Sequence, residues 1–235
     1  MLEIIAETVA DAVAAQAGGA TQLDLKSDLT EGGLSPTAGM LAAVRKRVTI
    51  DIVVMIRPHV RGTVYSPDDV EVMCHDIRTA RDLGADGFLT GANTLDRKLD
   101  LKAIESFRQA AGDLPLHFHM FWMETGNQEK TLQQLIDLGA ASVRTTGGLS
   151  MASKAPDGLE GIRKQRELAA GRIDLFLAGG VNAGNIARLV AETGVIHAHA
   201  GTGVRVPETS TGEVAAEKVR VLRLALDQAV AKIAG

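Results

Sequence analysis

The stretch SPDDVEVMCHDIRTARDLGADGFLT (residues 66–90) contains one helix followed by one strand. Ser66 carries a side-chain oxygen that can cap a helix, Pro67 suits the first turn, and Gly84 can end the last turn. The short segment GFLT (87–90) that follows is typical of a buried strand. The stretch therefore predicts one helix-to-strand unit.

The same unit recurs along the chain. Three more helices end at glycine directly before a strand, in AVAAQAGGA (12–20), QLIDLGA (134–140) and LVAETGV (189–195). Alternating strands and helices predict a parallel sheet. We expect strands at 2–7, 21–26, 51–57, 87–90, 116–120, 142–145, 174–179 and 195–200.

Eight such units in 235 residues fit an α/β fold of the (β/α)8 TIM-barrel type, in one domain over residues 1–235. An open dinucleotide-binding sheet is the alternative, but the first strand-to-helix turn, AETVADA (6–12), lacks the G-x-G-x-x-G pattern. In the last segment (211–235), Val214, Val221, Leu224 and Ala225 stand at helical spacing, which predicts a final helix that closes the barrel.

Composition argues against several classes of protein. The net charge is -4 and the basic residues are scattered, so we expect no nucleic-acid partner. Apolar runs fall well short of the roughly 20 residues of a membrane span, and the start of the chain carries acids, so we expect no membrane partner and a cytoplasmic location. A lone cysteine, Cys74, cannot form an internal disulfide or a thiolate cluster.

Polar residues gather near the carboxyl ends of the expected strands, where TIM barrels carry their active sites. Residues two apart on a strand face the same side. This rule pairs Asp24 with Lys26, His117 with His119 and His197 with His199, and it places Arg57 with Val53 and Met55. With Glu3 and Arg144 they form an inward set of mixed charge, which fits either a chemical site or a structural ion network.

Three turns near the same end are rich in glycine or hydroxyl groups. LAGGVNAGN (177–185) contains Gly179 and Gly180, HAGTGV (199–204) contains His199 and Gly201, and TTGG (145–148) contains Thr146. Such loops bind phosphate or carboxylate groups in many barrels. The alternative is that tight turns need glycine for a positive φ angle.

The sequence also resembles a known family. LEIIAET (2–8), EGGLSPTAGMLAAVRKRVTI (31–50), IRPH (56–59) with Tyr65 and Ser66, LPLHFH (114–119) and LAGGVNAGNI (177–186) together are similar to the CutC copper-homeostasis family, in the same order along nearly the whole chain. The resemblance implies a cytoplasmic (β/α)8 barrel, often a homo-oligomer, with a link to copper tolerance. It does not by itself imply a reaction.

The resemblance assigns the inward polar set to Glu3, Asp24, Arg57 and His119, with Glu31 in the loop after the second strand. Where this family usually reads Phe-His-Arg-Ala-Phe-Asp, the chain reads FHMFWM (118–123), so Met120 and Met123 replace an arginine and an aspartate. Lys26 replaces a common cysteine, and Arg144 replaces a leucine. We therefore hypothesise that a guanidinium group has moved from the fifth strand to the sixth and still lies at the carboxyl end of the barrel.

Two functions are open at this point. The first is copper homeostasis with Cu(I) binding, for which His117, His119, Met120 and Met123 offer nitrogen and sulfur. Residues 117 and 119 face one way and residue 120 the other, so a shared ion needs a bent strand end. Gap-filling in the core is the alternative role of the methionines.

The second function is an enzyme of lyase, aldolase or isomerase type that acts on a small anionic or phosphorylated hydroxy or carbonyl compound. The glycine turns would bind the anion, Arg57 would hold a carboxylate or phosphate, and Glu3, Asp24 or His119 would move protons. Lys26 could form a Schiff base with a carbonyl, or could form an ion pair with Asp24.

Overall fold

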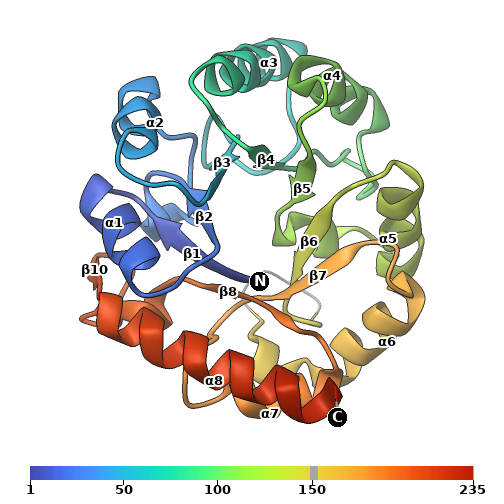
Figure 1. Ribbon diagram of the computed structural model, residues 1–235. Coiled ribbons are helices and arrows are strands. Elements are labelled where there is room, and N and C mark those ends of the chain that lie inside the picture. The colour runs from blue at the N-terminus through green and yellow to red at the C-terminus, as the bar shows by residue number, and fades with distance from the viewer. Residues whose placement is uncertain (149–152, 235) are drawn as a thin grey trace.

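Eight parallel strands form a closed barrel inside a ring of helices in the computed structural model of the chain, which describes residues 1–148 and 153–234 (Figure 1). Neighbouring strands follow each other in chain order, and β8 pairs with β1 to close the barrel. The predicted (β/α)8 fold is confirmed. The strands are β1 (Leu2–Ala6), β2 (Gln22–Leu25), β3 (Asp51–Met55), β4 (Gly87–Thr90), β5 (Leu116–Phe118), β6 (Ser142–Thr145), β7 (Asp174–Leu177) and β8 (His197–Ala200).

The helices between and after the strands make the outer layer. They are α1 (Val9–Ala17), α2 (Ala38–Arg45), α3 (Pro67–Asp82), α4 (Leu101–Ala111), α5 (Gln128–Asp137), α6 (Leu159–Ala169), α7 (Ile186–Thr193) and α8 (Ala216–Ala234). Short 3-10 turns are η1 (Leu29–Glu31), η2 (Met120–Glu124), η3 (Ala155–Asp157) and η4 (Thr202–Val204), and a small hairpin joins β9 (Arg205–Val206) to β10 (Glu213–Val214).

The helix-to-strand unit that predicts the fold forms as expected. Ser66 caps α3: its backbone N–H donates to the Asp69 carboxylate at 2.9 Å, and its hydroxyl accepts from the Asp69 N–H at 3.2 Å. Gly84 follows the helix with φ +89°, a conformation that side chains disfavour. The exchange between Ser66 and Asp69 satisfies two N–H groups at the start of the helix, and glycine lets the chain turn toward β4.

Strand ends differ from the prediction where the chain bends. Bounds of β4 and β6 are as predicted, but β3 ends at Met55 and β5 at Phe118. After His119 the chain turns into η2, so the side chains of 120–124 do not continue the strand alternation.

The predicted apolar face of the last helix is wrong. Val214 lies in β10, and Val221 and Leu224 are exposed. The buried positions of α8 include Val219, Leu222, Leu226 and Ala229.

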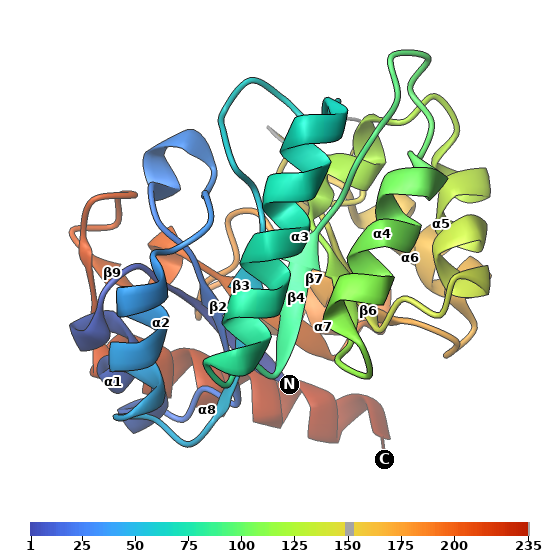
Figure 2. The same cartoon turned by 90° about the horizontal axis from the view of Figure 1, so that it is seen from above.

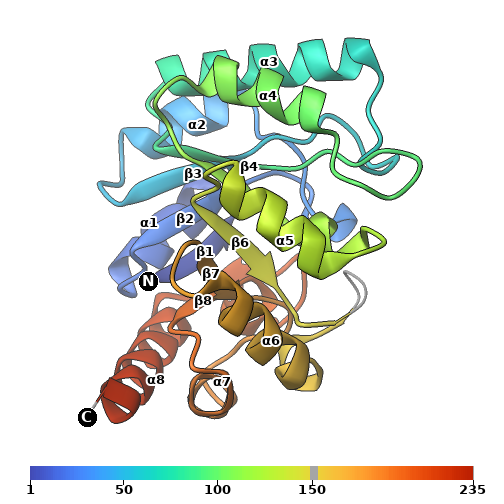
Figure 3. The ribbon, with the colours of Figure 1, turned by 90° about the vertical axis from the view of Figure 1, so that its right-hand side faces the viewer.

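Apolar side chains pack mainly between the barrel and the helices. A second, smaller cluster of Val53, Met55, Leu89 and Phe121 lies on the inward-facing positions of β3 and β4 and on η2. One side of the barrel interior is therefore apolar, and the polar residues described below occupy the other side. Loops that follow β3 and β4 project from the carboxyl end of the barrel (Figure 2), and the N-terminus lies at the opposite end (Figure 3).

Across residues 1–148 and 153–234, no helix combines the length and apolar character that crossing a membrane requires.

Candidate functional site

The centre of the barrel holds a buried ion pair between Glu3 on β1 and Arg144 on β6. Both side chains are fully buried. Arg144 donates from Nε to Glu3 Oε1 at 2.9 Å and from Nη2 to Glu3 Oε2. A bidentate pair of this kind fixes both side chains, because two parallel hydrogen bonds restrict the relative orientation of the two groups more than one does.

Side chains from the neighbouring strands complete this network. Glu3 Oε2 also accepts from the Gln22 amide at 2.5 Å, and Oε1 lies 2.5 Å from His199 Nδ1. Gln22 and His199 are the direct register partners of Glu3 on β2 and β8. The carboxylate of Glu3 therefore ties the two strands beside it to β6 across the barrel.

Arg144 has two further contacts. Its Nη1 donates to Ser142 Oγ at 2.7 Å, and Ser142 Oγ lies 2.7 Å from His117 Nδ1. The guanidinium also lies 4.8 Å from the centre of the Phe176 ring. Each of the three guanidinium nitrogens of Arg144 thus makes a hydrogen bond to a neighbouring side chain.

Burial and charge set the protonation of these groups. Burial alone would raise the pKa of Glu3, but the Arg144 charge and the His199 hydrogen bond outweigh it and hold the pKa well below the ordinary value. Burial, with the Arg144 charge second, lowers the pKa of His117 to about 3. Burial, followed by the Lys26 charge, lowers the pKa of His119 well below its ordinary value. Both histidines are therefore neutral at neutral pH.

A second ion pair joins Asp24 on β2 to Lys26 just after it. Lys26 Nζ lies 2.7 Å from Asp24 Oδ2, and both side chains are buried. The pair lacks hydrogen-bond geometry, and neither carboxylate oxygen of Asp24 has a hydrogen-bond partner among the described residues. Lys26 fits only because residue 33 is glycine: a Cβ at Gly33 would lie 2.5 Å from Lys26 Cδ and 3.1 Å from Nζ.

Arg57, just beyond β3, holds two loops in place. Its Nη1 donates to the carbonyl of Glu31 at 2.7 Å and of Gly33 at 3.0 Å, and Nη2 donates to the carbonyl of Val60 at 3.4 Å. Nε is buried and has no partner within the described part of the chain. Arg57 therefore presents a buried N–H without a partner at Nε. Glu31 contributes its backbone carbonyl to this arrangement, and its side chain is exposed.

His119 follows β5 beneath a ring from η2. Its Nδ1 is buried and lacks a hydrogen-bond partner in residues 1–148 and 153–234. The Phe121 ring lies 4.8 Å from the His119 ring, and the Arg57 guanidinium lies 4.9 Å from the Phe121 centroid. Phe121 thus packs against both polar residues and joins them to the apolar side of the barrel.

Comparison with known proteins fits this arrangement. The CutC family model matches residues 1–204. The chain belongs to the CutC family. A CutC family protein of Chromobacterium violaceum is 34% identical over 247 aligned positions, which cover 97% of this chain and 99% of that protein.

Solved structures give the same fold. A crystal structure from Streptococcus agalactiae, described as a copper homeostasis protein CutC, matches with TM-score 0.80 and 30% identity over 86% of this chain and 97% of that one. Thiamine phosphate pyrophosphorylase from Pyrococcus furiosus matches with TM-score 0.63 at 19% identity over 97% of this chain and 96% of that one, a likeness of fold alone.

The charge of the barrel interior bears on which ligand this CutC family member could hold. Among the described residues at this site, the buried cations Lys26, Arg57 and Arg144 outnumber the buried carboxylates Glu3 and Asp24. The ligand atoms of Glu3, Asp24 and His199 lie within 4.8 Å of one another, which is close enough for one metal ion. However, Arg144 and Lys26 already neutralise both acids, so a further cation would add to a positive surplus.

The four predicted copper ligands contact different neighbours. His117 uses Nδ1 on Ser142, and its Nε2 lies 2.9 Å from the Cβ position of Gly87. Met123 Sδ is 3.5 Å from the Thr145 hydroxyl and 3.8 Å from that of Thr146. The remaining two residues differ as well: Met120 packs against the main apolar core, and His119 has a buried Nδ1 without a hydrogen-bond partner among the described residues. These contacts do not fit a common Cu(I) site.

The predicted anion turns form a rim at the carboxyl end. Gly179 and Gly180 have φ +77° and +74°. A Cβ at Gly179 would lie 2.9 Å from Thr146 Cγ2, so glycine is required here by close packing. Lys154, which the sequence patterns did not indicate, lies 3.3 Å from the Cβ position of Gly180 and adds a cation to this rim.

Gly201 and His199 also have structural roles. A Cβ at Gly201 would lie 2.8 Å from Ile5 Cδ1, and His199 contacts Glu3. Anion binding at the rim therefore stays a prediction, since packing accounts for each of these residues on its own.

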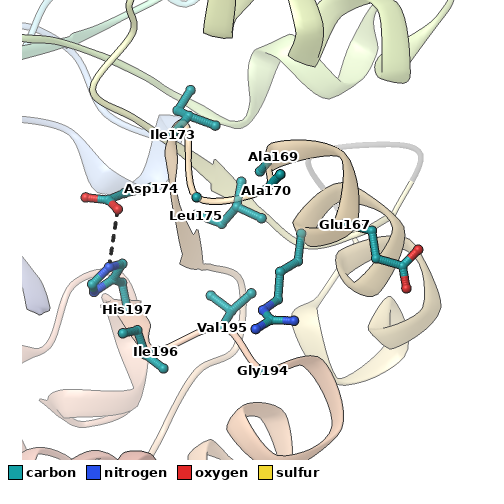
Figure 4. Close-up of a pocket in the computed structure, with 12 residues that line it drawn as sticks. Glu167, Ala169, Ala170, Ile173, Asp174, Leu175, Gly194, Val195, Ile196 and His197 are labelled. Carbon is teal, nitrogen blue, oxygen red and sulfur yellow. Dashed lines mark ion pairs between the residues drawn. The ribbon is translucent and has the colours of Figure 1, made fainter.

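A pocket of about 400 Å³ lies at the other end of the barrel, between α6, the start of β7 and the segment before β8 (Figure 4). His197 Nε2 lies 3.5 Å from Asp174 Oδ1 on its wall. Because TIM-barrel chemistry is carried at the carboxyl ends of the strands, we do not assign the function of the protein to this pocket.

The sequence analysis missed three residues that contact the Glu3–Arg144 pair: Gln22, Ser142 and Phe176. Gln22 and Ser142 stand two residues before Asp24 and Arg144, so the same alternation could have found them. Phe176 gives no such signal, because an aromatic residue on a buried strand is ordinary core.

Proposed function

We propose that this CutC family protein binds a small anionic hydroxy or carbonyl compound at the carboxyl end of its barrel and moves a proton on it. We also propose the cytoplasmic location that the composition predicts.

The observation that carries this proposal is a group of buried polar atoms at this site that lack hydrogen bonds to the described residues: both Asp24 carboxylate oxygens, Arg57 Nε and His119 Nδ1. Buried polar groups normally have partners, and an exception calls for a ligand, water or functional role. The surplus of buried cations over carboxylates favours an anion as that ligand.

Each residue has a distinct role in this proposal. Arg57 Nε donates to an anionic oxygen of the ligand. His119 is neutral, so its unpaired Nδ1 can accept a proton or, in the other tautomer, donate one. Glu3 makes four hydrogen-bond contacts to three neighbours and positions Arg144, so we do not assign it a proton-transfer step.

A thermal-shift screen of small hydroxy and oxo carboxylates and phosphates tests the proposal, with inorganic chloride salts as reference. A compound at 100 times its Kd should stabilise the protein by about 2.7 kcal/mol. His119→Gln should weaken that stabilisation, and His75→Gln, a change at an exposed histidine of α3, should leave it intact. If no anion raises the midpoint, or if both variants respond like the parent chain, the proposal fails.

Copper binding is the second function to test. The related Streptococcus agalactiae structure is described as a copper homeostasis protein, and neutral His119 has a free nitrogen lone pair, the form that binds metals. Titration with Cu(I) against a competing chelator should give one tight equivalent that His119→Gln removes. No competition with the chelator would rule this function out.

The expected homo-oligomer also stays a prediction, and light scattering coupled to size exclusion will test it.

A further inference from the structure

We infer that Lys26 is a Schiff-base nucleophile, which forms a covalent imine with a carbonyl compound that carries one negative charge, such as a 2-oxo carboxylate. This inference rests on the proposed function, because the same site must first bind the anion.

Lys26 is buried beside Asp24 at the carboxyl end of the barrel. It follows β2, its side chain is only 1% exposed, and its amine lies 2.7 Å from the Asp24 carboxylate. An ammonium group has three N–H donors, and neither oxygen of the Asp24 carboxylate paired with it has a hydrogen-bond partner among the described residues. Buried lysines of this kind serve as amine nucleophiles in barrel enzymes.

A glycine at position 33 leaves room for the Lys26 side chain. Gly33 has φ +100°, and any Cβ there would collide with Lys26 Cδ. Arg57 contacts the same turn: its Nη1 donates to the Gly33 carbonyl and lies 3.6 Å from the Cβ position of Gly32. Lys26 and Arg57 are therefore neighbours across two glycines, one suited to a carbonyl carbon and the other to a carboxylate.

Imine formation at Lys26 balances in atoms and in charge. The Lys26 ammonium gives a proton to Asp24, and the free amine forms a bond to the carbonyl carbon of the ligand. The carbonyl oxygen takes up that proton and one more from Lys26 Nζ, and it leaves as water. The product is a protonated imine, so the positive charge beside the Asp24 carboxylate is the same before and after. The net change is ammonium plus carbonyl to iminium plus water, with no oxidant or reductant.

The ligand class follows from the same balance. Because Lys26 keeps its charge in the imine, the buried cations still outnumber the buried carboxylates. The ligand therefore has to supply the compensating negative charge. A carboxylate next to the carbonyl supplies one negative charge at the distance of a single bond from the reacting carbon, and Arg57 Nε is an unpaired buried donor for it.

Reductive trapping tests the inference. The protein is incubated with pyruvate or glyoxylate and sodium cyanoborohydride, which reduces an imine to a stable secondary amine, and the modified residue is located by intact-mass analysis and peptide mapping. We expect one adduct per chain, at Lys26. Lys102→Met, a change at an exposed lysine of α4, should leave the adduct unchanged. Lys26→Arg should abolish it while keeping the charge.

Two additions keep the test decisive. Since the Lys26 side chain lies against Gly33 and arginine is bulkier, the neutral double variant Asp24→Asn/Lys26→Met provides a second chain without the amine. Lactate, which has no carbonyl group, is tested in parallel by thermal shift. If pyruvate and lactate both stabilise the protein but no adduct forms at Lys26, the Schiff base is wrong and the proposed binding function stands. If neither stabilises it and no adduct forms, both are wrong.

Discussion

Replacing Arg144 by methionine should destabilise the protein by about 3 kcal/mol or more at pH 7.5. The variant leaves the fully buried Glu3 carboxylate without its bidentate partner, and Ser142 Oγ loses a donor. Removing one member of a buried ion pair costs about 3–5 kcal/mol, because the remaining charge stays out of water. Gln22 and His199 still contact Glu3, which puts the expected loss at the lower end of that range.

Urea denaturation followed by far-UV circular dichroism gives the free energy of unfolding. The double variant Glu3→Gln/Arg144→Met should recover a large part of the loss, because no charge is left unpaired. Arg188→Met is the matched control: it removes an exposed Arg–Glu192 pair on α7 and should cost no more than about 0.5 kcal/mol.

Acid should reduce the loss in the Arg144→Met variant. Without the guanidinium, burial raises the pKa of Glu3, and the carboxyl group then becomes neutral as the pH falls. The reasoning would be refuted if Arg144→Met costs no more than Arg188→Met, or if the double variant is no more stable than the single one.

Two further predictions concern acid and glycine. The folded pKa of His117 is about 3 against an ordinary 6.5, so the unfolded chain binds more protons between these values, and stability present above pH 6.5 is lost as the pH falls toward 3. The test uses the window from pH 6.5 to pH 5, above the range where Glu3 titrates. In this window His117→Gln should reduce the slope of the free energy of unfolding against pH by up to about 1.4 kcal/mol per pH unit. Equal slopes in the parent chain and the variant would contradict this prediction. Gly33→Ala should lower the thermal midpoint more than Gly62→Ala, because both have positive φ but only the first would strike Lys26; equal losses would show that Lys26 is not confined by Gly33.

Periodicity and glycine placement predicted the barrel, because α1, α3, α5 and α7 end at or just before a glycine with positive φ and each strand is short and largely buried. Strand alternation also brought Glu3, Asp24, Lys26 and Arg144 to the interior, where the structure has them. These features are local, so one stretch of sequence carries each of them.

The partners of the inward residues could not be predicted in the same way. Arg57 donates to carbonyls of Glu31, Gly33 and Val60, which depends on how two loops fold back on each other. The direction of Met123 depends on the 3-10 turn η2, which replaces the end of the expected strand. No periodic pattern encodes such loop geometry.

Glu3 has one more consequence, for the way in which the barrel closes. Its carboxylate contacts Gln22 and His199, its register partners on either side, and β1–β8 is the pairing that joins the first strand to the last. A slip of β1 by one residue would turn Glu3 outward into the apolar layer beneath the helices, away from Arg144, and leave a charge in hydrocarbon. A barrel with an aliphatic interior would tolerate that slip far better. The polar interior therefore selects one alignment of the closing seam and penalises the neighbouring ones.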